Sequence, residues 1–131
     1  MIEPETLHEI AKFNLAPLPA PRMVRSDKWS KRSVVLKYFS FRSLMRYEAR
    51  KQNFVLPPDL IVKFFIAMPP AWSKTKRAYM NGKPHQQTPD IDNLCKSFMD
   101  SLCSQDSYVH SITASKVWSV EPQIIIYSHA K

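Results

Sequence analysis

Glycine is almost absent from this sequence, which holds one glycine among 131 residues. The glycine-rich loops that bind phosphates in Walker A and dinucleotide-binding proteins need several glycines close together. The composition therefore excludes nucleotide-binding enzymes of these two classes. We accordingly expect no nucleotide cofactor.

Cysteine and histidine are also few, with two cysteines and four histidines in the chain. They have neither C-x-x-C nor H-x-x-x-H spacing, so a structural zinc site has no support in the sequence. Cys95 and Cys103 fall on one predicted helix, where a rise of ~1.5 Å per residue separates them by roughly 12 Å. This separation is too large for a disulfide bond, and we expect two free thiols.

Long hydrophobic runs are missing as well. The longest uninterrupted apolar stretch, residues 64–68, is far too short to cross a bilayer. The first ten residues carry Glu3, Glu5 and Glu9 and no apolar run, so no signal peptide is expected. The sequence thus predicts a cytoplasmic protein that does not associate with a membrane.

Positive charge, in contrast, is abundant. Nineteen Lys and Arg residues against eleven Asp and Glu residues give a formal net charge of +8, and the pI is about 9.7. A hydrophobic share of 44% is ordinary for a folded domain, so a packed core is expected. The excess of cations is typical of proteins that bind a polyanion, with nucleic acid as the first candidate.

Hydrophobic periodicity and turn residues predict a single α+β domain over residues 1–131. The expected order is β-α-β-α-β-β, with a mixed sheet covered by two helices. The predicted elements are a strand in 7–16, a helix over 37–52, a strand over 60–68, a helix from Thr88 to about Leu102, and a closing hairpin of two strands in 111–127. Two basic loops, residues 22–32 and 69–88, connect these elements.

The two predicted helices are amphipathic, and each has a distinctive polar face. The first has a basic stripe at i, i+4 and i+8, formed by Arg42, Arg46 and Arg50. The second buries an apolar face and presents the opposite face with Asp92, Lys96 and Asp100 at the same spacing. Its apolar face consists of Ile91, Leu94, Cys95, Phe98 and Leu102.

Acidic residues cluster around this second helix: Asp90, Asp92, Asp100 and Asp106 lie within seventeen residues of a basic chain. Phosphodiester cleavage commonly uses Mg²⁺, which binds hard carboxylate oxygens. Residues two apart on a helix point about 200° apart, so Asp90 must precede the helix if it shares a metal with Asp92. Spacing alone also fits an ordinary helix start with capping aspartates, and an ion pair between Asp100 and Lys96.

A longer motif surrounds these acids. Residues 89–96 read PDIDNLCK and residues 98–102 read FMDSL. This pattern resembles the D-x-D-N-L-x-K-x-x-x-D-x-L signature of the RusA family of Holliday junction resolvases, found mostly in phages and prophages. The resemblance continues through Asp106 and Lys116 into a strand pair with a proline at its turn, and covers residues 89–127.

The resemblance implies a small α+β homodimer that cuts four-way DNA junctions with Mg²⁺, for which Mn²⁺ can substitute. Position by position, it assigns the metal ligands to Asp90, Asp92 and Asp106. Lys96 would stabilise negative charge at the scissile phosphate or position water. Asp100 would support the site, for example by holding Lys96. One departure from the pattern is Gln105, because relatives often carry two adjacent acids at this point.

Both basic loops are candidate nucleic-acid-binding segments, although solvated charge is the plainer interpretation of either. The second loop interleaves aromatic rings with cations, as in proteins that stack bases and contact phosphates. Lys116 is a further candidate, or it extends from an apolar strand face with no role in the site. The candidates in the two loops are Arg22, Arg25, Lys28, Lys31, Arg32, Trp72, Lys74, Lys76, Arg77 and Lys83.

Two functions are consistent with these features. The first is a structure-selective, Mg²⁺-dependent endodeoxyribonuclease that resolves branched DNA, in which a symmetric dimer makes paired nicks in opposed strands. The second is a non-catalytic nucleic-acid-binding protein of phage origin, whose acids only cap a helix. Cleavage of a four-way junction discriminates between them.

Overall fold

Strand β2 (Asp59–Ala67) lies inside a four-stranded sheet with the order β1-β4-β2-β3. The computed structural model describes residues 7–22 and 32–129, apart from the side chain of Asp106. Strand β1 (Leu7–Phe13) pairs antiparallel with β4 (Gln123–His129), and β4 pairs antiparallel with β2. Strand β3 (Ser111–Ser119) pairs parallel with β2. The predicted mixed sheet and α+β class are confirmed.

The closing hairpin predicted for the last two strands is wrong. Strands β3 and β4 are consecutive in the sequence, but β2 lies between them in the sheet. Nine residues of β2 pair with β3, from Asp59 opposite Ser111 to Ala67 opposite Ser119. A tight hairpin would have left β2 with an unpaired edge, whereas here its backbone groups have partners on both sides.

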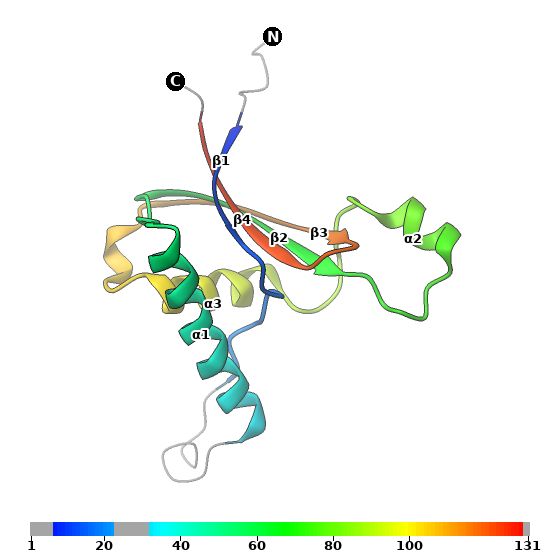
Figure 1. Cartoon of the computed structure of the whole chain (residues 1–131), viewed down its shortest axis with the longest axis horizontal. Coiled ribbons are helices and arrows are strands. Elements are labelled where there is room, and N and C mark those ends of the chain that lie inside the picture. Colours follow the sequence, from blue (N-terminus) through cyan, green and yellow to red (C-terminus); the bar gives the residue numbers. More distant parts are fainter. Residues whose placement is uncertain (1–6, 23–31, 130–131) are drawn as a thin grey trace.

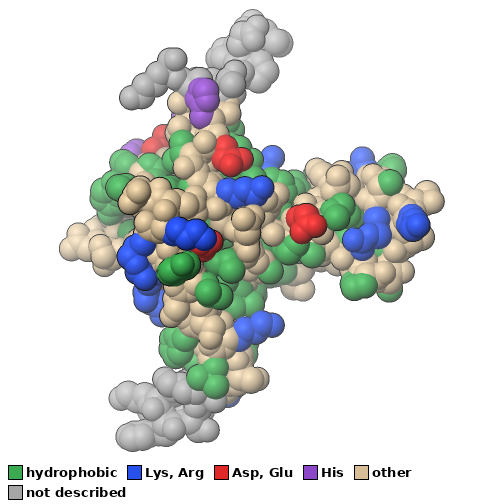
Figure 2. All heavy atoms as spheres, viewed as in Figure 1, with side chains coloured by type: hydrophobic (Ala, Val, Ile, Leu, Met, Phe, Trp, Pro, Cys, Tyr) green, Lys and Arg blue, Asp and Glu red, His purple; other side chains and the backbone are tan. Residues whose placement is uncertain are grey.

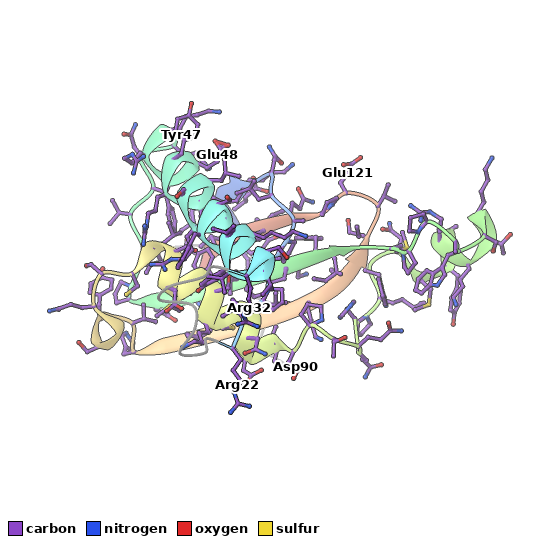
Figure 3. All side chains as sticks on the ribbon, turned by 90° about the horizontal axis from the view of Figure 1, so that it is seen from below. Arg22, Arg32, Tyr47, Glu48, Asp90 and Glu121 are labelled. Atoms are coloured by element: carbon purple, nitrogen blue, oxygen red, sulfur yellow. The ribbon has the colours of Figure 1, made fainter. Side chains whose placement is uncertain are left out.

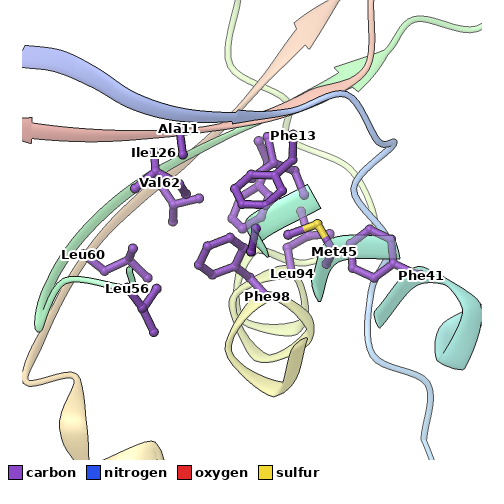
Figure 4. Close-up of a cluster of buried hydrophobic side chains, with 13 residues drawn as sticks. Ala11, Phe13, Phe41, Met45, Leu56, Leu60, Val62, Leu94, Phe98 and Ile126 are labelled. Carbon is purple, nitrogen blue, oxygen red and sulfur yellow. The ribbon is translucent and has the colours of Figure 1, made fainter. Parts of the chain in front are cut away.

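Helices α1 (Ser33–Lys51) and α3 (Ile91–Leu102) lie together on one face of the sheet, and the short helix α2 (Lys74–Met80) stands apart from both (Figure 1). Figure 4 shows Leu94 and Phe98 of α3 directed at the sheet, beside Phe41 and Met45 of α1. Leu94 and Phe98 are fully buried. The predicted apolar face of α3 and the two covering helices are therefore confirmed.

One helix begins earlier than predicted, and one helix was not predicted. Helix α1 begins at Ser33, four residues before the predicted start at Lys37, and Val35 of this extra turn is buried. Helix α2 was predicted as part of a loop. The Ser73 hydroxyl accepts a hydrogen bond from the Lys76 amide and caps this helix. A serine cap before a helix-forming run is the sequence signal that identifies it.

Cys95 and Cys103 are free thiols, as predicted. Within residues 7–22 and 32–129, the structure contains no helix with the length and hydropathy that crossing a bilayer requires. A further short helical segment, the 3-10 helix η2 (Asp106–Tyr108), connects α3 to β3.

Candidate active site and nucleic-acid interface

Asp90 occupies the N-cap position of α3, with an extended backbone (φ −72°, ψ 148°). The helix predicted from Thr88 therefore begins later than expected, at Ile91, with Asp90 as its N-cap. The first bond of the helix runs from the Leu94 amide to the Asp90 carbonyl at 3.1 Å, so Thr88 lies outside the helix. Asp90 precedes the helix, as sharing a metal with Asp92 in the first turn requires.

The carboxylates of Asp90 and Asp92 are both exposed. Asp90 makes no capping hydrogen bond through its side chain, although an N-cap aspartate commonly accepts one from the first turn. Asp92 accepts a hydrogen bond from the neighbouring Asn93 amide at 2.9 Å. Capping therefore does not account for the Asp90 side chain, and both acids remain accessible to a hard cation.

The backbone of Asp106 lies in η2, beyond the C-terminal end of α3. Asp90 and Asp92 lie at the opposite end, and the twelve residues of α3 separate the two ends by about 17 Å at ~1.5 Å per residue. The structure thus places Asp90 and Asp92 at the start of α3 and the backbone of Asp106 beyond its other end. Among the described side chains, which exclude that of Asp106, no three His, Cys, Asp or Glu groups form a metal-binding cluster.

Lys96 lies one turn after Asp92 on the same exposed face of α3. Asp100, one turn further, is half-buried and accepts a hydrogen bond from the Tyr38 hydroxyl of α1 at 2.7 Å. Burial and then this hydrogen bond raise the pKa of Tyr38 well above its ordinary value. The hydrogen bond that the structure gives the Asp100 carboxylate therefore joins α3 to α1.

The basic stripe of α1 is also directed at α3. The Arg46 guanidinium donates to the Ser101 carbonyl at 2.9 Å, and Arg42 donates to the Asp100 carbonyl at 3.4 Å. Both cations thus meet the last carbonyls of α3, where the helix dipole favours positive charge. A tertiary contact of this kind is not visible in the spacing of the arginines.

The segment before α3 runs along the free edge of β3. Gly82 and Lys83 exchange backbone hydrogen bonds with Trp118, and the His85 amide donates to the Lys116 carbonyl at 3.0 Å. The His85 ring is buried and packs on Trp118 at 4.3 Å between ring centroids. Burial, followed by the charge of Lys116, lowers the pKa of His85, which favours the neutral form of its ring.

The Lys116 side chain continues this attachment. Its ammonium donates to the Gln87 carbonyl at 2.5 Å and to the Pro89 carbonyl at 2.6 Å. The segment that ends at Asp90 is therefore bonded to β3 through the main chain and then through one lysine. This attachment was not among the expectations for Lys116 from the sequence, which were a contact with DNA or no role in the site.

Residues 69–83, which we call the arm, project from the sheet and carry α2 (Figure 1). No acid occurs among residues 69–89, and lysine and arginine side chains lie on the arm at the right of Figure 2. Lys76 lies 4.2 Å from the centre of the Trp72 ring, and Lys83 lies 4.4 Å from that of Tyr79. The Tyr79 ring is 69% exposed, so the arm presents cations and an aromatic surface to solvent.

Two residues of the arm that were predicted to contact DNA are half-buried and contact other parts of the protein. Arg77 is half-buried, and its guanidinium donates to the Pro69 carbonyl at 2.9 Å, which fastens α2 to the end of β2. Trp72 is half-buried against Trp118, with ring centroids 4.7 Å apart. Lys74, Lys76 and Lys83 are the exposed cations of the arm.

Of the first basic loop, Arg25, Lys28 and Lys31 lie outside the described residues. The Arg32 guanidinium donates to the Arg22 carbonyl at 2.7 Å. Figure 3 shows Arg22 and Arg32 on the same side of the molecule as Asp90. The Ala20 amide donates to the Asn93 carbonyl at 3.3 Å, so this segment passes beside the start of α3.

A family model described as endodeoxyribonuclease RusA matches residues 15–127. The match extends well upstream of the acidic motif and includes β2, the arm and both covering helices. No curated protein and no solved structure matches the chain. Because the family model covers most of the 131 residues, the chain belongs to the endodeoxyribonuclease RusA family.

Proposed function

We propose that this protein resolves four-way (Holliday) DNA junctions by metal-dependent hydrolysis of phosphodiester bonds, acting as a homodimer. The observation that carries the proposal is the pair of exposed carboxylates, Asp90 and Asp92, at the start of α3 in a basic member of a DNA nuclease family. Carboxylate oxygens that are open to solvent are the ligands that Mg²⁺ prefers, and water and phosphate can complete its coordination.

Each residue of the proposed site has a separate task. Asp90 and Asp92 would hold Mg²⁺ or Mn²⁺, and a bound ion supplies positive charge that stabilises the negative charge developing on the phosphate. Lys96 shares the exposed face of α3 with Asp92 and directs a second positive charge toward the same phosphate. The lysine is not a metal ligand, so its contribution is independent of metal affinity.

The homodimer follows from the substrate and from the position of Asp106. A four-way junction is close to two-fold symmetric, and a symmetric dimer presents two sites to opposed strands. Asp106 remains a proposed third ligand. Because its backbone lies beyond the far end of α3, a second copy of the chain is the source from which it can approach Asp90 and Asp92.

The experiment that tests this function uses an end-labelled four-way junction and a linear duplex of the same sequence. Each is incubated with the protein in Mg²⁺, in Mn²⁺ or in EDTA. We expect symmetric nicks in two opposed strands of the junction in either metal, no cleavage in EDTA, and little cleavage of the duplex. Junction binding without cleavage in any metal would contradict the proposal and favour a non-catalytic DNA-binding protein.

The arm is proposed to bind the DNA backbone through its exposed lysines. Junction affinity should fall linearly with salt on logarithmic axes, with a slope of roughly −0.9 for each phosphate neutralised. Replacing Lys74 and Lys76 with alanine should therefore reduce the magnitude of that slope by about 1.8. The slope is measured by titrating labelled junction in EDTA at several salt concentrations.

The matched control for this prediction is the double replacement of Lys12 and Lys51 with alanine. These lysines are also exposed, and β1 and the end of α1 hold them near each other, because Gln52 forms hydrogen bonds with the Lys12 backbone. Both double variants remove two charges, but only the first removes them from the arm. A slope for the Lys74 and Lys76 variant equal to those of the wild type and the control would show that the arm does not contact DNA.

A further inference from the structure

We infer that Lys116 is a positioning residue, which holds the segment before α3 so that the Asp90 carboxylate is presented in a fixed place. This inference rests on the proposed function, because it concerns the same pair of carboxylates. It assigns to Lys116 a task inside the protein and not a contact with DNA.

The first support is the geometry of the ammonium group. Its two hydrogen bonds, 2.5 Å to the Gln87 carbonyl and 2.6 Å to the Pro89 carbonyl, join β3 to residues 29 and 27 positions earlier in the sequence. Hydrogen bonds from a charged donor are shorter and stronger than those between neutral groups. One side chain is thus hydrogen-bonded to two residues of the same short segment.

The second support is the location of the Pro89 carbonyl. It belongs to the peptide unit whose nitrogen is that of Asp90, and this unit is planar. A bond that fixes the direction of the Pro89 carbonyl therefore also fixes the plane from which the Asp90 Cα extends. On the other side, the Asp90 carbonyl accepts the first bond of the helix, from the Leu94 amide at 3.1 Å.

The third support comes from the rest of the segment. Up to His85, the main chain is attached to β3 by backbone hydrogen bonds. Among the described residues, the two bonds from Lys116 are the hydrogen bonds that hold the backbone between His85 and Asp90. Without the ammonium, residues 86–89 would connect β3 to the candidate site with no backbone hydrogen bond to any described residue.

A contact with DNA is the competing role, and the structure disfavours it. Lys116 is half-buried, and two of its three N–H groups already donate to carbonyls. A phosphate would have to compete with these two acceptors. The exposed lysines of the arm have no such carbonyl partners in the described part of the chain.

The test compares three variants of the full chain. K116M keeps an unbranched apolar stem but has no N–H donor, and K116R keeps the charge and the donors. K63M is the matched control, because it removes one charge from β2, next to β3, where the Lys63 ammonium lies 6.0 Å from the centre of the Phe65 ring. The first measurement is ¹⁵N relaxation of the Thr88 and Asp90 amides, which reports motion in the absence of metal and DNA.

We expect wild-type and K63M order parameters near ~0.85 at these two amides, and a fall below ~0.6 in K116M. In K116R the order parameters of these amides should be closer to the wild-type values than to those of K116M. The second measurement is Mn²⁺ binding by electron paramagnetic resonance. Its dissociation constant should rise about tenfold in K116M, because disorder at Asp90 must be removed on binding, whereas K63M should match the wild type.

Unchanged order parameters in K116M would overturn the inference and leave the proposed nuclease function intact. A loss of metal-free junction affinity in K116M, larger than in K63M and without a change in order parameters, would instead make Lys116 a DNA contact. The wild-type protein could cut no junction while K116M still lowers the order parameter of the Asp90 amide. This outcome would overturn the proposed function alone. The two proposals therefore fail in different measurements.

Discussion

Replacing Asp92 with asparagine is expected to lower the rate of junction cleavage by more than about a hundredfold. Removing groups that merely support metal ligands costs about ten- to a hundredfold, so losing a ligand should cost more. Junction binding in EDTA should stay unchanged or tighten, because one negative charge facing the phosphates is gone. The helix should persist, since an amide oxygen can still accept the hydrogen bond from Asn93.

The measurement is the single-turnover rate of cleavage over a Mg²⁺ titration, with protein in excess over junction. Glu121→Gln is the control, because it also removes an exposed carboxylate but lies in the turn between β3 and β4, away from Asp90 in Figure 3. An Asp92→Asn protein that cleaves within about tenfold of the wild type would remove Asp92 from the site.

The second large effect is expected from Lys96→Ala. Cleavage should slow by about a hundred- to a thousandfold, the usual loss when one group that stabilises transition-state charge is removed. The Mg²⁺ concentration at half-maximal rate should hardly change, because an ammonium is not a metal ligand. Arginine should restore little activity, since its planar fork does not replace a compact ammonium. Both quantities come from the same single-turnover titrations.

Asp100 tests whether Lys96 acts alone. Since the Asp100 carboxylate accepts a hydrogen bond from Tyr38, Asp100→Asn should lose less activity than Asp90 or Asp92 replacements. In the double variant, the fold-decrease in cleavage rate from Asp100→Asn should multiply with that from Lys96→Ala, as expected for residues that act independently. A double variant no slower than Lys96→Ala would show that Asp100 works by holding Lys96. A loss at Asp100 that excess Mg²⁺ repairs would make it a metal ligand.

Local patterns predicted the parts of this fold that depend on neighbouring residues. The apolar spacing of α3 correctly predicted the buried face of the helix, which carries Leu94 and Phe98. This was possible because the helical period can be recognised from residues that are close in the sequence. Strand pairing is different, since partners come from distant parts of the chain. The sequence of β3 and β4 fits a hairpin, and only the position of β2 between them decides against it.

The candidate site divides in the same way. Asp90 and Asp92 are two residues apart in the sequence, so a motif and helix geometry were enough to place both at the start of α3. Asp106 follows one helix later, and the length of α3 decides where its backbone lies. The bonds of Lys116 to Gln87 and Pro89 depend on the path of a long segment along β3. No spacing rule connects a strand lysine with two earlier carbonyls.

The sheet order has a consequence for how the protein is made. Strand β4 lies between β1 and β2, yet of the described elements it is the last to be synthesised. Until residues 123–129 leave the ribosome, β1 has no strand to pair with, and the buried Ile124 and Ile126 are missing from the core. Contacts between the two ends of a chain form slowly. The sheet can therefore be completed only after β4 has been synthesised, and apolar strand edges are exposed to chaperones until then.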